Sequence, residues 1–92
     1  MIAEYADRWE YINVHHSAEW DCWLVTAYDK NDDQVGDSET EYRKEDAVGL
    51  ARAYLDSDRC DVIFVYTKNG KLQSSAMGKR VTGGNPFGDA NK

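Results

Sequence analysis

The sequence predicts a two-layer α+β domain in which one helix packs on one face of an antiparallel β-sheet, with the element order β-β-β-α-β-β. Most of the chain consists of short segments rich in β-branched and aromatic residues, which are typical of strands. One segment, residues 44–55, instead spaces its apolar residues by three and four, which is typical of a helix with one buried face. The chain has 92 residues, enough for a single domain with one modest core.

Three strands are expected before the helix. Residues 9–16 (WEYINVHH) and 20–28 (WDCWLVTAY) are rich in aromatic and β-branched side chains, so each segment predicts a strand. Residues 34–42 predict a third strand, which is polar and therefore expected at an edge of the sheet. Gly36 and Asp37 interrupt it, and both residue types form strands poorly.

The helix predicted over residues 44–55 has Glu45 and Asp46 in its first turn, where acidic side chains favour the helix dipole. Gly49 lies in its interior and costs roughly 1 kcal/mol relative to alanine. A glycine retained at that cost suggests that the helix packs closely against the sheet.

Two further strands are expected after the helix. Residues 61–67 (DVIFVYT) form the most apolar strand, and residues 71–76 return beside it. Asn69-Gly70 between them is the preferred two-residue hairpin turn, because both residues tolerate positive φ. Residues 1–77 are therefore expected to form the domain. Residues 78–92 are rich in glycine and lack apolar periodicity, so they are expected to form a flexible tail.

Strand alternation divides the apolar residues between the two faces of the sheet. One parity predicts the side that faces the helix: Ile12, Val14, Trp23, Val25, Ile63 and Val65. The other parity predicts an aromatic face: Trp9, Tyr11, His15, Trp20, Cys22, Leu24, Phe64 and Tyr66. That second face is too aromatic for ordinary solvent surface, and its candidate residues for binding a partner or a second copy are Trp9, Tyr11, Trp20, Phe64 and Tyr66.

The densest charge lies in residues 29–41 (DKNDDQVGDSETE), which contain six carboxylates and one lysine. These are Asp29, Asp32, Asp33, Asp37, Glu39 and Glu41. A surface of this kind repels nucleic acid and attracts proteins whose own surface is basic. The other interpretation is structural, since charged edge strands prevent aggregation and acidic surfaces keep small proteins soluble. The sequence leaves both interpretations open.

Basic residues gather near the end of the chain, at Lys68, Lys71, Lys79 and Arg80. They predict a small positive region opposite the acidic segment. Four charges are too few for independent binding of nucleic acid at physiological salt. They could add contacts to RNA phosphates within a larger protein interface.

Composition and motifs argue against catalysis and against a metal. Asp29-x-Asn31-x-Asp33 begins like a calcium loop, but Gln34 and Thr40 occupy the positions of the required glycine and glutamate. His15 and His16 are neighbours on a strand, so they point to opposite faces and do not share one metal. Neither histidine has a visible nucleophile beside it in the sequence. We therefore expect no catalytic residue, no metal site and no cofactor.

The two cysteines, Cys22 and Cys60, are too few for a disulfide framework and indicate free thiols in a reducing compartment. The first residues (MIAEYADRWEY) do not resemble a signal peptide, and the longest apolar run is too short to span a membrane. These features predict a cytoplasmic protein with a formal net charge of −6.

Part of the chain resembles a family of short uncharacterised bacterial domains. The matching parts are INVHH, WDCWLVTAY, Glu45-Asp46-Ala47 with Ala51-Arg52, and VIFVYTKNGKLQ, which together span residues 12–73. The sequence departs from the family pattern at Arg43, where a capping threonine is usual. The resemblance implies the β-β-β-α-β-β order, and the family has no established activity to transfer.

In size and acidity the chain also resembles small phage-encoded anti-CRISPR proteins that act on a type I surveillance complex. That resemblance implies a non-enzymatic inhibitor in the host cytoplasm. It would bind the Lys/Arg-rich grooves that hold guide RNA and receive DNA, and would block target DNA. Two other hypotheses are a self-associating or structural domain whose aromatic face forms a homodimer, and a small metal-binding protein or enzyme.

Overall fold

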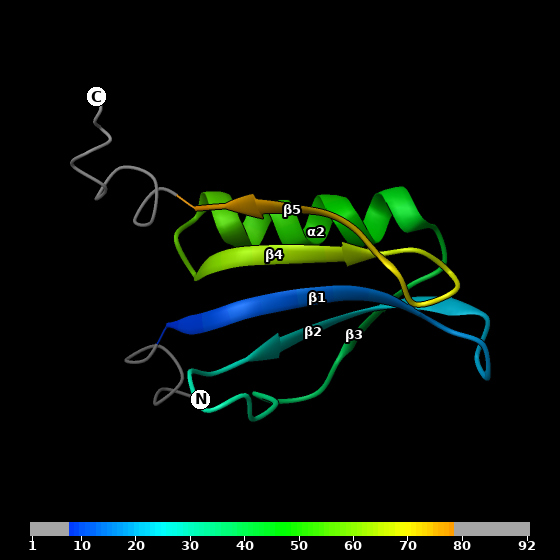
Figure 1. Cartoon of the computed structure of the whole chain (residues 1–92), viewed down its shortest axis with the longest axis horizontal. Helices are drawn as coiled ribbons and strands as arrows, with labels where there is room; N and C mark the ends of the chain where they lie inside the picture. Colours follow the sequence, from blue (N-terminus) through cyan, green and yellow to red (C-terminus); the bar gives the residue numbers. More distant parts are fainter. Residues whose placement is uncertain (1–7, 79–92) are drawn as a thin grey trace.

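The computed structural model describes residues 8–78, which form a five-stranded sheet with one helix packed against it (Figure 1). The predicted α+β class is confirmed. The elements are β1 (Trp9–Ser17), β2 (Cys22–Tyr28), β3 (Glu39–Glu41), α2 (Lys44–Asp56), β4 (Cys60–Tyr66) and β5 (Leu72–Met77). The tail predicted over residues 78–92 lies outside the described residues from Lys79 onward, and so do residues 1–7.

The sheet has the strand order β3-β2-β1-β4-β5, with β1 at its centre. The expectation of a wholly antiparallel sheet is wrong, because β1 and β4 are parallel while the other three pairs are antiparallel. The helix explains the difference. Its 13 residues span about 20 Å and return the chain from the end of β3 to the end of the sheet where β1 begins. A strand that starts there runs parallel to β1.

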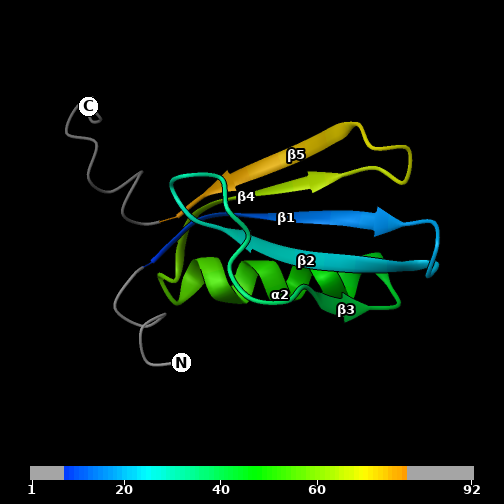
Figure 2. The ribbon, with the colours of Figure 1, turned by 90° about the horizontal axis from the view of Figure 1, so that it is seen from below.

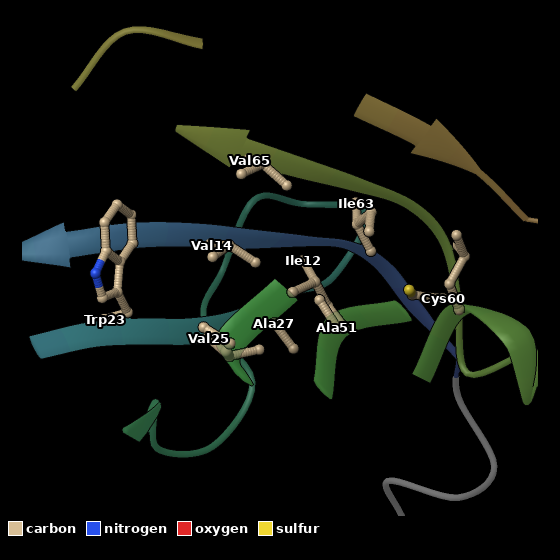
Figure 3. Packing of buried hydrophobic residues seen from close by; sticks show 11 residues of the cluster. Ile12, Val14, Trp23, Val25, Ala27, Ala51, Cys60, Ile63 and Val65 are labelled. Carbon is tan, nitrogen blue, oxygen red and sulfur yellow. The ribbon is translucent and has the colours of Figure 1, made fainter. Parts of the chain in front are cut away.

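The core lies between the helix and one face of the sheet (Figures 2 and 3). The prediction of the helix-facing residues is confirmed, since all six are buried: Ile12, Val14, Trp23, Val25, Ile63 and Val65. The helix adds Ala47, Ala51 and Leu55. Two of these three are alanines, whose short side chains let the helix backbone approach the β-branched side chains of β1 and β4.

Strict alternation fails at the first residues of β1 and β4. Trp9 of β1 is paired with Cys60 of β4, and both contribute to the core. The next core residue is three positions later in each strand, at Ile12 and Ile63, whereas alternation would put residues three apart on opposite faces. The indole of Trp9 meets the ring of Tyr54 on the helix, with ring centroids 5.0 Å apart. The placement of Trp9 on the aromatic face is therefore wrong. The pairing of β1 with β4 keeps one register from Trp9 and Cys60 to Tyr11 and Val62, so the two strand starts depart from alternation together.

The hairpin between β4 and β5 is one residue longer than predicted. The amide of Thr67 donates to the carbonyl of Lys71 at 2.8 Å, and the amide of Gly70 donates to the carbonyl of Thr67 at 2.9 Å. Residues 68–70 thus form a three-residue loop, in which Gly70 alone has positive φ, at +88°. This is the geometry in which a glycine follows a type I turn.

Two glycines behave in opposite ways, and the interpretation of Gly49 as a close-packing position is wrong. Gly49 is exposed, and a Cβ atom built on it meets nothing within 4 Å. Gly78 is buried, and a Cβ there would lie 3.1 Å from both the carbonyl oxygen of Cys60 and the Cδ1 atom of Leu55. The position that requires a glycine for close packing is therefore Gly78, where the backbone after β5 passes Leu55 of the helix and Cys60 of β4.

Alanine at these two positions should shift stability in opposite directions. Gly49→Ala should raise the free energy of unfolding by about 0.5–1 kcal/mol, because alanine loses less conformational entropy in a helix. Gly78→Ala should lower it by about 1–3 kcal/mol, because the added methyl group overpacks a filled site. Urea denaturation of the two variants beside the unchanged protein measures both shifts. Equal shifts of the same sign would contradict this packing.

Candidate functional site

The acidic segment, residues 29–41, forms the loop after β2 and then the edge strand β3 (Figure 2). The predicted edge position is confirmed, but β3 has three residues where nine were expected. The segment leaves the sheet in steps. The amide of Val35 still donates to the carbonyl of Ala27 at 2.8 Å, after which Gly36 turns the chain away with φ +70°.

Three of the six carboxylates also hold the local structure. Asp29 accepts hydrogen bonds from the backbone amides of Asn31 and Asp33 at 2.8 and 3.0 Å, so it stabilises the turn. Asp32 accepts from the hydroxyl of Tyr11 at 3.0 Å. The turn interpretation of this motif thus has direct support, because the Asp29 side chain is used by the loop backbone.

The third engaged carboxylate is Glu39, which accepts a hydrogen bond from the hydroxyl of Tyr54 at 2.5 Å. This bond, with burial of the ring, raises the pKa of Tyr54 to about 12. The phenol therefore stays protonated at neutral pH and ties the edge strand to the helix.

None of the six carboxylates forms an ion pair with a basic side chain within residues 8–78. Ion pairs do form elsewhere in this part of the chain. Arg8 bridges Asp58 and Asp61 at 2.6 Å each, and Arg43 meets Glu45 at 2.6 Å. Within residues 8–78, the negative charge of residues 29–41 is therefore not neutralised by ion pairs, and its potential extends into solvent.

A groove of about 380 Å³ lies between the acidic segment and the helix, and we call it the acidic groove. It exists because the short β3 leaves the helix-facing side of the sheet uncovered next to β2. Its apolar floor includes Val25, Ala27 and Val35, and its mouth carries Asp37 and Glu39.

The far wall of the groove is aromatic and carries one cation. Trp9 and Tyr54 form this wall, and the guanidinium of Arg59 lies over the indole, 4.7 Å from the ring centroid. The indole Nε1 of Trp9 is buried and has no hydrogen-bond partner in the described chain. The sequence analysis missed this groove, because its lining comes from six elements or loops that only the fold brings together.

The opposite face of the sheet carries the predicted aromatic cluster without Trp9. Tyr11 stacks on Tyr28 with centroids 4.9 Å apart, and Phe64 meets Tyr11 edge-on at 5.7 Å. Removal from water and the bond to Asp32 raise the pKa of Tyr11 to about 12. Tyr28 was not among the candidates, although alternation along the second strand places it on the same face as Leu24.

The remaining two aromatic candidates lie on either side of this cluster. Tyr66 is half-buried on β4 and is paired with Leu72 of β5. Trp20 lies in the turn before β2 rather than in the strand and is 70% exposed. Trp20 joins Leu24 and Tyr42 around a separate shallow hollow.

The basic candidates do not form a strong positive region within the described residues. Because β1 and β4 are parallel, the turn that holds Lys68 and Lys71 lies at the same end as the β1–β2 turn (Figure 1). That second turn carries Glu19 and Asp21, so the formal charges of the two turns cancel. The other two candidates, Lys79 and Arg80, lie outside the described residues.

The histidines and cysteines do not assemble into a site. His15 is 3.1 Å from the hydroxyl of Thr26, and burial lowers its pKa, whereas His16 packs edge-on against Trp23. Cys60 is fully buried, and burial raises the pKa of its thiol to about 11, so it is a poor nucleophile. Among residues 8–78, no three histidine, cysteine or acidic side chains are grouped to hold a metal ion.

Comparisons with protein-family models, with curated proteins and with solved structures found no match. The fold and the site together define a small α+β domain whose most distinctive surface is an acidic segment beside a groove, without ion pairs to the rest of residues 8–78. Within the described residues, no helix has the length and apolar character needed to cross a bilayer.

Proposed function

We propose that the protein is a non-enzymatic inhibitor that binds a basic, nucleic-acid-handling protein complex and blocks its target DNA. The resemblance in size and acidity favours a type I CRISPR surveillance complex as that partner. The observation that carries the proposal is the charge of residues 29–41, whose six carboxylates form no ion pair with a basic side chain in residues 8–78. Such a surface is attracted to the same Lys/Arg-rich grooves that bind phosphates.

The position of the segment suits this role. It occupies a loop and an edge strand, away from the core, so a partner can reach it without disturbing the packing of the sheet. Asp33 and Asp37 are exposed, and their carboxylates have no side-chain partner in the described chain. Two of the engaged carboxylates, Asp32 and Glu39, accept hydrogen bonds from tyrosine hydroxyls. The loop is therefore already ordered and loses less conformational entropy on binding.

Blocking without catalysis predicts a stoichiometric dose response. When the protein is titrated into a fixed amount of a susceptible surveillance complex, binding of target DNA should fall in proportion and end near one equivalent per site. An enzyme turns over, so it would inactivate excess complex at a small fraction of one equivalent. Gel-shift or fluorescence anisotropy of labelled target DNA measures the dose response.

Reversal provides the matching control. Inhibition should disappear after the complex and the inhibitor are separated by dilution and affinity capture, because no covalent change remains. Complete and lasting inhibition at a small fraction of one equivalent would overturn the proposal and favour an enzyme. No effect on any surveillance complex would remove the CRISPR assignment.

A second candidate function is self-association, which the other edge of the sheet favours. β5 (LQSSAM) contains no charged residue, and five of its six residues are exposed, including Leu72 and Met77 at 57% and 60%. An uncharged edge strand is a template for pairing with another strand. Sedimentation equilibrium separates the two candidates, because a stable homodimer under dilute conditions favours self-association.

A further inference from the structure

We propose that the acidic groove is a binding site for a long basic side chain, lysine or arginine, presented by the partner protein. This inference rests on the proposed function, because that function supplies a partner with a basic surface. It goes further by naming the residues that receive the partner and the chemistry that they select.

The interior of the groove suits the aliphatic part of such a side chain. Its floor includes Val25, Ala27 and Val35, and one wall is formed by the rings of Trp9 and Tyr54. Lysine and arginine bury their methylene stems against surfaces of this kind while the charged group stays near water. An aromatic wall also favours a nearby cation.

The mouth of the groove suits the charged group. Asp37 is exposed and its carboxylate has no side-chain partner in the described chain. Oε2 of Glu39 accepts one hydrogen bond, from the hydroxyl of Tyr54. Because a carboxylate has about four acceptor positions, Glu39 can still accept hydrogen bonds from a cation. Two carboxylates at one mouth favour a charge-assisted bond to an ammonium or guanidinium group.

The lining contains one internal cation, the guanidinium of Arg59. Arg59 lies over the indole of Trp9, on the wall rather than at the mouth. The groove as a whole has two carboxylates against one guanidinium, so it keeps a negative excess. That excess distinguishes it from an apolar hollow, which would select aliphatic or aromatic side chains without regard to charge.

Trp9 provides a direct reporter of occupancy. Its indole N–H is buried in the wall and has no hydrogen-bond partner within residues 8–78. Because an indole N–H gives an isolated NMR signal, filling of the groove can be followed at this atom, with Trp9→Phe used to assign the signal.

The test uses the full chain labelled with nitrogen-15 and a minimal probe, N-acetyl-lysine-N-methylamide. The probe should shift the Trp9 indole signal in a saturable way, and added salt should weaken its binding. N-acetyl-norleucine-N-methylamide has a similar apolar stem without the charge, and it should bind at least tenfold more weakly. Equal shifts with both probes, or no saturable shift with lysine, would overturn the proposal.

Two double variants with the same change in net charge separate the groove from general electrostatics. Asp37→Asn with Glu39→Gln removes the carboxylates at the mouth, while glutamine keeps an acceptor for Tyr54. Asp33→Asn with Glu41→Gln removes two carboxylates from the same segment but outside the groove. The first pair should weaken binding of the lysine probe at least tenfold, and the second by less than about twofold. Equal weakening would mean that the groove does not select the cation.

The outcome is independent of the inhibition experiment, because the probe test contains no surveillance complex. If the groove fails to bind the probe while the protein still blocks DNA stoichiometrically, the groove proposal falls and the proposed function stands. If the groove binds the lysine probe while no complex is inhibited, the proposed function falls and the site remains a receptor for basic peptides.

Discussion

Replacing Ile63 with alanine should lower the free energy of unfolding by about 2–5 kcal/mol. Ile63 is 1% exposed and lies on β4 between Ile12 of β1 and Ala76 of β5. Alanine would remove apolar contacts and leave a cavity beneath the helix. Small domains have a total stability of about 5–15 kcal/mol, so this loss is a large part of the whole. Urea denaturation with an unchanged m-value measures it.

Lys30→Ala is the control for this prediction. Lys30 is exposed in the loop after β2, and such substitutions usually change stability by less than about 0.5 kcal/mol. Similar denaturation midpoints for Ile63→Ala and Lys30→Ala would show that the core has been placed wrongly.

Reversing charge in the acidic segment should slow association with the basic partner. The variant Asp33→Lys with Asp37→Lys changes two exposed carboxylates in the loop after β2 that have no side-chain partner among residues 8–78. Charge complementarity mainly steers encounter, and steering raises association rates by about 10- to 1,000-fold. The variant should therefore associate about tenfold more slowly at low salt, and the difference should shrink as salt screens the charges. Stopped-flow or surface-based kinetics at two ionic strengths measures both effects.

A variant with equal net charge controls for a general charge effect. Glu19→Lys with Asp46→Lys reverses two exposed carboxylates at the end of the sheet opposite Asp33 and Asp37, in the β1–β2 turn and the first turn of α2. It should slow association by less than about threefold, because the change lies far from the proposed contact. If both double variants slow association equally, residues 29–41 act only through the net charge of the molecule. Unfolding curves confirm that each variant is folded.

The elements of the fold were largely predictable from local patterns. Val14 and Val25, in neighbouring strands, were placed correctly toward the helix because alternation along a strand needs no knowledge of its neighbours. The predicted helix, residues 44–55, agrees with the observed helix, Lys44–Asp56, within one residue. The sequence itself shows where the apolar residues change from alternation to spacings of three and four.

The candidate site was predictable only in part. Residues 29–41 were recognised as an acidic turn and edge strand from composition alone. The groove beside them was not, because Trp9 and Tyr54 lie far apart in the sequence and meet only when helix and sheet pack. Trp9 was assigned to the wrong face, because strict alternation does not extend to the first residue of β1, whose indole packs against Tyr54 of the helix.

The sequence by itself determined which segments form strands and a helix, which face of most strands is buried, and where the negative charge gathers. These properties depend on neighbours along the chain, namely periodicity, propensity and composition. The tertiary structure alone decided the parallel pairing of β1 with β4, the close contact at Gly78 and the acidic groove. Each of these depends on where the helix returns the chain, and that path is set by packing between residues distant in sequence.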